Sequence, residues 1–324
     1  MTLARADRAS RSPAAPGATA ASTDVRSAKR RQNLKSQMAA WAFVAPLVAY
    51  LAAFYVYPLY RNLDLSLHHY TVRSFVSGGA PFAGLDNFRT VFDDPTFWPA
   101  IRNTFVFTLV SIAFQYSAGL ALAVFFSRRF RLSGVLRALF LIPWLLPLIV
   151  SSSTWAWMMN SESGFLNYAL HFLGIGPVDW LTSPTWALAS VIIANIWIGI
   201  PFNLVILHSG LQNISPDLYE AAAIDGAGPW QRFRRITFPL LRPVSAIVLL
   251  LGFVYTLKVF DLIWIMTKGG PSDASTTLAT WSYRLGFGSL LPKFGPGAAV
   301  GNILILIALV FGLLYIRVSR RQQA

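Results

Sequence analysis

The sequence has no cysteine and little charge. Cysteine is absent from all 324 residues, which excludes disulfide scaffolds and thiolate metal sites. Only 12% of the residues are charged, whereas 55% are hydrophobic, a balance far from that of an ordinary soluble domain. The scarcity of charge therefore predicts a protein that crosses a membrane several times.

The sequence also lacks the motif G-x-x-x-x-G-K-[ST]. P-loop ATPases need such a loop to cradle nucleotide phosphates, so any energy from ATP must come from a partner. The histidines suggest no metal or catalytic set, because His68 and His69 are adjacent and Asp64 could at most share a helical face with His68. We therefore predict a chain that is not an enzyme and binds no metal or cofactor itself.

Six stretches are long and apolar enough to cross a bilayer. A spanning helix needs about 20 mostly apolar residues, and its backbone groups must pair within the helix. The predicted fold is therefore an all-α, polytopic membrane protein, in which Pro143, Pro147 and Pro201 kink their helices without breaking them. The six predicted spans cover residues 38–57, 104–126, 135–158, 186–208, 244–266 and 297–318.

Most of the 27 Lys and Arg residues lie on one side of these predicted spans. The positive-inside rule then places both termini in the cytoplasm. Residues 1–37 are rich in Ala, Ser and Arg and should form a disordered basic tail that contacts lipid headgroups, and residues 319–324 should form a second, short tail. Because the basic residues cluster beside apolar spans, nucleic acid is not an expected partner.

A compact polar block, residues 215–243, separates the fourth and fifth predicted spans. Ser215 followed by Pro216 and Asp217 predicts a helix start, and Gly226 predicts its end because glycine readily adopts a positive φ. A second helix should begin at Pro229 and end at Pro239. A plain connecting loop with two helices and a glycine turn is the simplest interpretation of these residues alone. The predicted common face of the second helix carries Trp230, Phe233 and Thr237.

This block resembles the EAA motif of the permease subunits of bacterial ABC importers, and we call residues 215–243 the EAA-like segment. The similarity continues upstream in LQNISPDLYEAAAIDGAG and downstream in FDLIWIMTKGGPSDASTTLATWSYRLGF, which look like the branch of maltose, glycerol-3-phosphate and oligosaccharide permeases. It covers roughly residues 41–317. The motif residues are Glu220, Ala221, Ala222, Asp225, Gly226, Ala227, Phe233 and Pro239.

The resemblance implies the transmembrane domain of a type I ABC importer, over residues 38–318, in a bacterial inner membrane. The first helix of the EAA-like segment would sit in a groove of a cytoplasmic ATPase dimer, with ATP and Mg bound by those partner subunits and alternating access as the mechanism. A second, distinct permease subunit, for which Gly269-Gly270-Pro271 is typical, and an extracytoplasmic substrate-binding protein would complete the importer. The motif's carboxylates would make polar contacts at the joint and its alanines would allow close seating. Arg232, Arg234 and Arg235 would face solvent or lipid headgroups.

Candidate substrate-path residues lie in the fourth and fifth predicted spans. One helical face of the fourth could line a sugar path or pack against another helix. The resemblance matches it to the sugar site of maltose-type permeases, although Thr256 and Val259 replace asparagines and make maltose itself doubtful. Lys258 and Asp261 could pair with each other or contact substrate. The candidates are Asn195, Ile198, Gly199, Phe202, Tyr255, Thr256, Lys258, Val259 and Asp261.

The implied substrate is a disaccharide, an oligosaccharide or a related polyol. An alternative within the same class is sn-glycerol 3-phosphate or another phosphorylated polyol, for which Lys258 alone offers little cationic help. A more distant alternative is an ATP-independent carrier or channel.

Overall fold

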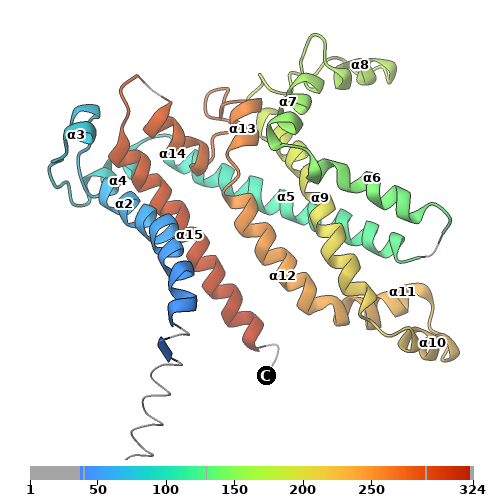
Figure 1. Ribbon diagram of the computed structural model, residues 1–324. Coiled ribbons are helices and arrows are strands. Elements are labelled where there is room, and N and C mark those ends of the chain that lie inside the picture. Colours follow the sequence, from blue (N-terminus) through green and yellow to red (C-terminus); the bar gives the residue numbers. More distant parts are fainter. Residues whose placement is uncertain (1–36, 39–40, 129, 289, 322–324) are drawn as a thin grey trace, which may run out of the picture. The chain divides into compact units, whose positions relative to one another are not determined.

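The computed structural model describes residues 37–38, 41–128, 130–288 and 290–321 (Figure 1). All but residue 37 of the predicted N-terminal tail lies outside these ranges, as do the last three residues of the predicted C-terminal tail. Every regular element of the described residues is a helix, and one isolated bridge pairs His68 with Phe82.

The described residues contain five helices that are long and apolar enough to cross a membrane. A sixth span is present if two consecutive helices, bent by 94° at the break between them, count as one. The five single spans are Trp41–Ser66, Phe97–Phe126, Ala187–Gln212, Pro229–Leu257 and Phe294–Arg317.

The chain divides into two units, residues 1–61 and 62–324. The described part of the first unit is helical and includes the π segment η1 (Ala52–Val56) and the first half of α2 (Tyr57–Ser66). Its apolar side chains are exposed from Trp41 to Tyr60. A helix with apolar surface of this length has the dimensions that a bilayer covers.

In the second unit, α5 (Phe97–Phe126) and α9 (Ala187–Gln212) form the most extensive helix pair (Figure 1). Two glycines bring these helices close together. A Cβ at Gly119 would collide with Asn203, and a Cβ at Gly199 would collide with the amide of Gln115. Small residues permit such close approach, which is how helices pack in lipid.

Three hydrophobic clusters hold further helices of the second unit against this pair. The first joins α5 and α9 to α13 (Asp261–Met266) and the end of α7 (Leu148–Met158). The second joins the start of α5 to α4 (Asp86–Asp93), α14 (Leu278–Phe287) and α15 (Phe294–Arg321). The third joins the ends of α5 and α9 to α12 (Phe238–Leu257). The shorter helices α3 (Val72–Ser77) and α8 (Phe165–Phe172) lie in the connections.

The third predicted span is broken, so the expectation that Pro147 only kinks its helix was wrong. Helix α6 (Ser133–Leu145) ends before Leu146, and α7 begins at Leu148 after a bend of 94°. Leu146 is extended because the ring of the following proline disfavours helical backbone in the residue before it. Pro143 and Pro201 lie inside helices, as expected.

The fifth predicted span, 244–266, is also interrupted. Helix α12 ends at Leu257, and α13 begins at Asp261. Leu262 and Ile263 are fully buried in the cluster around Phe107. Burial of these side chains against α5 and α9 accounts for the new helix direction, because packing outweighs local helix preference.

Candidate functional site

The EAA-like segment begins with α10 (Pro216–Ile224), which starts as predicted. The Asp217 amide donates to the Ser215 hydroxyl (3.3 Å), and Pro216 occupies the first turn. A hydroxyl cap, a proline without an N–H and an acid at the positive end of the helix all favour this start.

The turn after α10 requires glycine for its backbone conformation. The Ala227 amide donates to the Ala222 carbonyl (2.8 Å), and the Gly226 amide donates to the Ala223 carbonyl (3.1 Å), so the turn is a Schellman motif. Gly226 has a φ of 78°, and a Cβ there would meet nothing within 4 Å. The left-handed backbone, and not crowding, therefore selects glycine.

The second helix of the segment does not stop at Pro239, and the prediction of an end there was wrong. Helix α11 (Pro229–Arg232) continues through the π segment η2 (Phe233–Thr237) into α12, giving one helix from Pro229 to Leu257. The Phe238 amide donates to the Phe233 carbonyl. The wider π turn accommodates a proline that has no N–H to offer.

Some side chains of the EAA-like segment connect its two helices, and others are exposed. The hydroxyls of Tyr219 and Thr237 lie 3.0 Å apart and connect α10 to the second helix. The Trp230 ring stacks on the Phe233 ring at 5.5 Å. Of the three residues predicted to share a face, Thr237 is buried, whereas Trp230 is 70% exposed.

Half of the eight EAA motif residues are exposed. Glu220, Ala221, Asp225 and Gly226 are exposed, and neither carboxylate forms an ion pair with a described residue. Ile224, between them, is 87% exposed. A surface that combines unpaired carboxylates, small residues and large apolar side chains is suited to contact with a protein partner. Ala222, Ala227, Phe233 and Pro239 are half-buried.

Asn195 and Gly199, from the predicted substrate-path face, lie against α5. The Gln115 side chain donates to the Asn195 carbonyl (2.8 Å) and its amide occupies the space that a Cβ at Gly199 would need. Asn195 Nδ2 is buried and has no hydrogen-bond partner among the described residues. This half of the face is a helix-packing surface that still holds a free donor.

Phe202 joins rings from two other helices. Its ring lies edge-on to Trp144 of α6 at 6.1 Å and to Tyr255 of α12 at 6.2 Å, and Lys258 Nζ lies 5.1 Å from the centroid of the Tyr255 ring. Trp144, Tyr255 and Lys258 are exposed. Sequence reasoning missed Trp144, because its partners lie on helices remote in sequence.

The other fifth-span candidates are dispersed by the break after Leu257. Thr256 is buried, and Val259 packs against the same cluster as Ile198. Lys258 and Asp261 are both exposed and form no ion pair with each other. Ile198 and Val259 thus serve packing here, whereas Lys258 and Asp261 keep their charges available.

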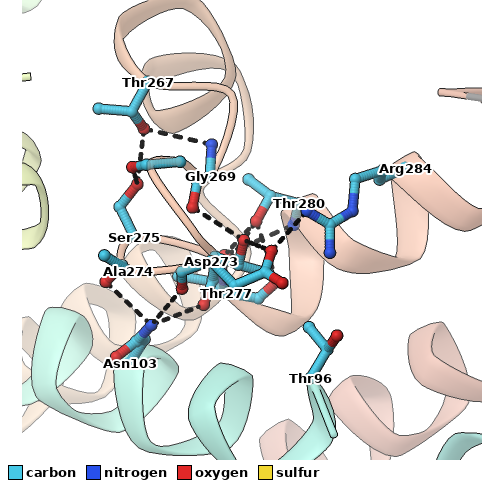
Figure 2. Close-up of polar contacts among 12 residues, drawn as sticks. Thr96, Asn103, Thr267, Gly269, Asp273, Ala274, Ser275, Thr277, Thr280 and Arg284 are labelled. Atoms are coloured by element: carbon cyan, nitrogen blue, oxygen red, sulfur yellow. Dashed lines mark hydrogen bonds and ion pairs between the residues drawn. The ribbon is translucent and has the colours of Figure 1, made fainter. Parts of the chain in front are cut away.

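A network of polar contacts fixes residues 267–277, the 267–277 loop (Figure 2). Asn103 Nδ2 of α5 lies 3.1–3.2 Å from the carbonyl oxygens of Asp273, Ala274 and Thr276. Arg284 of α14 donates to the Asp273 carboxylate at 2.5 Å. The loop thus carries its own internal supports and is anchored to two helices.

The electrostatics of this loop favour an ionised Asp273. Burial alone would raise the pKa of its carboxyl, but hydrogen bonds from Arg284, Thr276 and Thr96 outweigh burial and hold the pKa below its usual value. The sequence indicated Gly269-Gly270-Pro271 as a typical motif, but it did not indicate that Asn103 and Arg284 support the loop.

His68 lies beside Asp64, the residue that the sequence allowed to share a helical face with it. His68 Nδ1 lies 2.8 Å from the Asp64 carbonyl oxygen and 3.3 Å from its carboxylate. Across the ranges that the structure describes, no group of three or more His, Cys, Asp or Glu side chains could hold a metal ion.

Comparisons of this chain with known proteins point to one family. Residues 115–323 match the family described as binding-protein-dependent transport system inner membrane component. The trehalose/maltose transport system permease protein of Thermococcus litoralis is 37% identical over 86% of this chain and 93% of its own length. The lactose transport system permease protein of Rhizobium radiobacter is 34% identical over 87% of this chain and 94% of its own.

A solved structure shares the fold. A chain in the crystal structure of a bacterial ABC transporter that imports the acidic polysaccharide alginate aligns with a TM-score of 0.77 and 25% identity, over 90% of this chain and 99% of that one. The predicted all-α fold of an ABC importer permease is thereby confirmed, and with it a multi-pass membrane protein. The chain belongs to the family of binding-protein-dependent transport system inner membrane components.

Proposed function

We propose that this chain imports a sugar, as one half of the translocation path of an ABC importer. The observation that carries the proposal is similarity along nearly the whole chain to permeases named for trehalose/maltose, lactose and sulfoquinovosyl glycerol. These substrates differ in size and charge but all are sugars or sugar derivatives. Their shared chemistry, a ring with many hydroxyls, is what the path must accept.

The exposed EAA-like segment supports a partner that supplies energy. In this proposal α10 seats in a groove of an ATPase subunit dimer, which binds ATP and Mg, and Glu220 and Asp225 make polar contacts there. The carboxylates lack ion-pair partners among the described residues, which leaves them available. Both termini then lie in the cytoplasm, on the same side as the ATPase.

The proposed importer has two further components. A second, distinct permease subunit covers the apolar and aromatic surface that α6, α9 and α12 leave exposed, and an extracytoplasmic binding protein delivers the substrate. The solved alginate transporter is described in complex with a periplasmic protein that holds an alginate pentasaccharide, which supports such a partner.

The three rings of Trp144, Phe202 and Tyr255 are the proposed sugar contact. Their apolar faces can pack on a pyranose ring, while Lys258 beside Tyr255 offers a donor to hydroxyls. A phosphorylated polyol is the second candidate, supported by the exposed Lys258 ammonium group. Asp261, exposed three residues further on, disfavours an anion there.

Uptake into proteoliposomes tests the proposal. The complex, reconstituted with the cognate partner permease, ATPase and binding protein, should accumulate labelled sugar only with ATP, and Glu220→Gln should lower the rate. Glu162→Gln, a change at an exposed carboxylate outside the EAA-like segment, is the matched control and should leave uptake intact. Transport by the chain without an ATPase would refute the importer and favour an independent carrier.

Substitution of Trp144 tests the sugar contact. Trp144→Ala should raise KM for sugar uptake about fivefold, because aromatic contacts contribute about 1 kcal/mol. Trp186→Ala, at an exposed tryptophan that does not contact Phe202, is the control. A KM equal in both variants would remove Trp144 from the path.

A further inference from the structure

A cleft of about 820 Å³ lies behind the EAA-like segment, at one end of the spans of the second unit. Its walls come from the end of α5, the start of α6, the end of α9, α10 and the first turns of the helix that begins at Pro229. The membrane-spanning helices α5 and α9 end there, which sets the cleft at the level of lipid headgroups.

The cleft is lined by an excess of positive charge. Arg128, Arg137 and Arg232 line it, and Glu220 is the one carboxylate among its described lining residues. Arg137 and Arg232 make no side-chain hydrogen bond or ion pair with a described residue, and the Nε atom of each is buried without a partner. Both side chains are half-buried. Half-buried guanidinium groups without a partner beside a cavity favour an anion, because a bound anion offsets the cost of their partial desolvation.

Neighbouring arginines do not share this position. Arg234 and Arg235 follow Arg232 after one intervening residue, Phe233, but both are exposed and neither lines the cleft. Of these three arginines, Arg232 therefore lines the cleft and Arg234 and Arg235 do not.

We propose that this cleft binds the phosphate group of an anionic phospholipid. A guanidinium group matches phosphate oxygens with two parallel hydrogen bonds, and two such groups from α6 and α11 can hold one headgroup between them. The cleft volume of about 820 Å³ is many times the roughly 30 Å³ of one water molecule, so the cleft has room for more than a phosphate group. Phe140, which is exposed and lies about one helical turn beyond Arg137 on α6, offers an apolar surface for the start of an acyl chain.

The inference goes beyond the proposed transport function and does not depend on it. Its test uses the full-length chain purified in a zwitterionic detergent and measures bound lipid by native mass spectrometry. Phosphatidylglycerol and phosphatidylcholine with the same acyl chains are the two probes. The wild-type chain should retain phosphatidylglycerol at least about tenfold better, as expected for charge-assisted hydrogen bonds.

Variants decide whether the cleft is responsible. The double variant Arg137→Gln with Arg232→Gln should lose this preference, whereas the matched control Arg234→Gln with Arg235→Gln should keep it. Arg137→Lys with Arg232→Lys should keep part of it. The melting temperature in phosphatidylcholine establishes that each variant is folded, and a Lys variant that binds normally while the Gln variant does not excludes misfolding as the cause.

Four outcomes would overturn the proposal. Equal retention of the two lipids would remove any anion preference. An unchanged preference in the Arg137 and Arg232 double variant would place the lipid elsewhere. Stabilisation by inorganic phosphate at the same concentration as the lipid would assign the cleft to a soluble anion, and loss of the lipid when the ATPase is added would assign it to an acidic side chain of that partner.

Discussion

The EAA-like segment leads into α12 and the 267–277 loop follows α13, the next helix (Figure 1). The two are held in opposite ways. Between α10 and the helix that follows it, Tyr219 and Thr237 form the one side-chain hydrogen bond described, and a cleft lies behind α10. In the loop, Ser275, Thr276 and Thr277 are almost fully buried and bonded to neighbouring groups.

The EAA-like segment leaves a contact surface open, whereas the 267–277 loop has its polar groups bonded within the chain. Backbone carbonyls of the loop have their donor in Asn103, so the loop should open only with the core around it. The EAA-like segment leaves carboxylates and large apolar side chains exposed, and few buried contacts mean low local stability. Low local stability suits the EAA-like segment to a contact that moves, and high local stability suits the 267–277 loop to a position that stays fixed.

Removal of Asn103 should produce the largest effect. Asn103→Ala leaves three carbonyl oxygens without their donor in a buried site, so the free energy of unfolding should fall by about 3 kcal/mol. Thermal unfolding of the purified chain measures the change. Asn213→Ala, at an exposed asparagine, should have little effect, and equal losses in both variants would contradict the comparison.

Gly226→Ala should have the next largest effect. Its φ of 78° makes the substitution cost about 1–2 kcal/mol in the turn, and uptake by the reconstituted importer should fall with it. Gly228→Ala is a close control, because Gly228 has a φ of −69° and open space around it. The contrast between the two glycines would be lost if both variants transported normally.

Tyr219→Phe should loosen the EAA-like segment by a smaller amount. The hydroxyl contact with Thr237 contributes about 1 kcal/mol, so amide hydrogen exchange in α10 should increase about fivefold. The same change at the exposed Tyr168 should leave exchange in α10 unaltered. An α10 as protected as before would mean that other contacts hold it.

The smallest expected effect is a loss of stability of the 267–277 loop at acidic pH. Because the pKa of Asp273 is lower in the folded chain than in the unfolded one, its contribution to stability is present above about pH 4 and is lost as pH falls through the folded pKa. Wild-type melting temperature should therefore fall more than that of Asp273→Asn between pH 5 and pH 3. Parallel curves would show that the carboxylate does not support the loop.

Local signals were sufficient to predict the elements that local chemistry specifies. Apolar runs indicated the spans, and Ser215 and Gly226 marked the ends of α10 correctly. The breaks after Leu145 and Leu257 were missed because one depends on the residue before a proline and the other on burial of α13 against distant helices. The Asn103 support was also missed, since its partners lie about 170 residues away and no local pattern connects them.

The π segment η2 has a mechanical consequence. Because it carries the chain past Pro239 without a stop, a single rod of 29 residues, about 43 Å long, runs from Pro229 to Leu257. If a partner displaces the first turn of this helix, the displacement has one continuous helix to follow as far as Tyr255, with the π segment and Pro243 as the places where that helix can bend. The first break in the helix along this route comes at residues 258–260, where α12 ends and α13 has not yet begun.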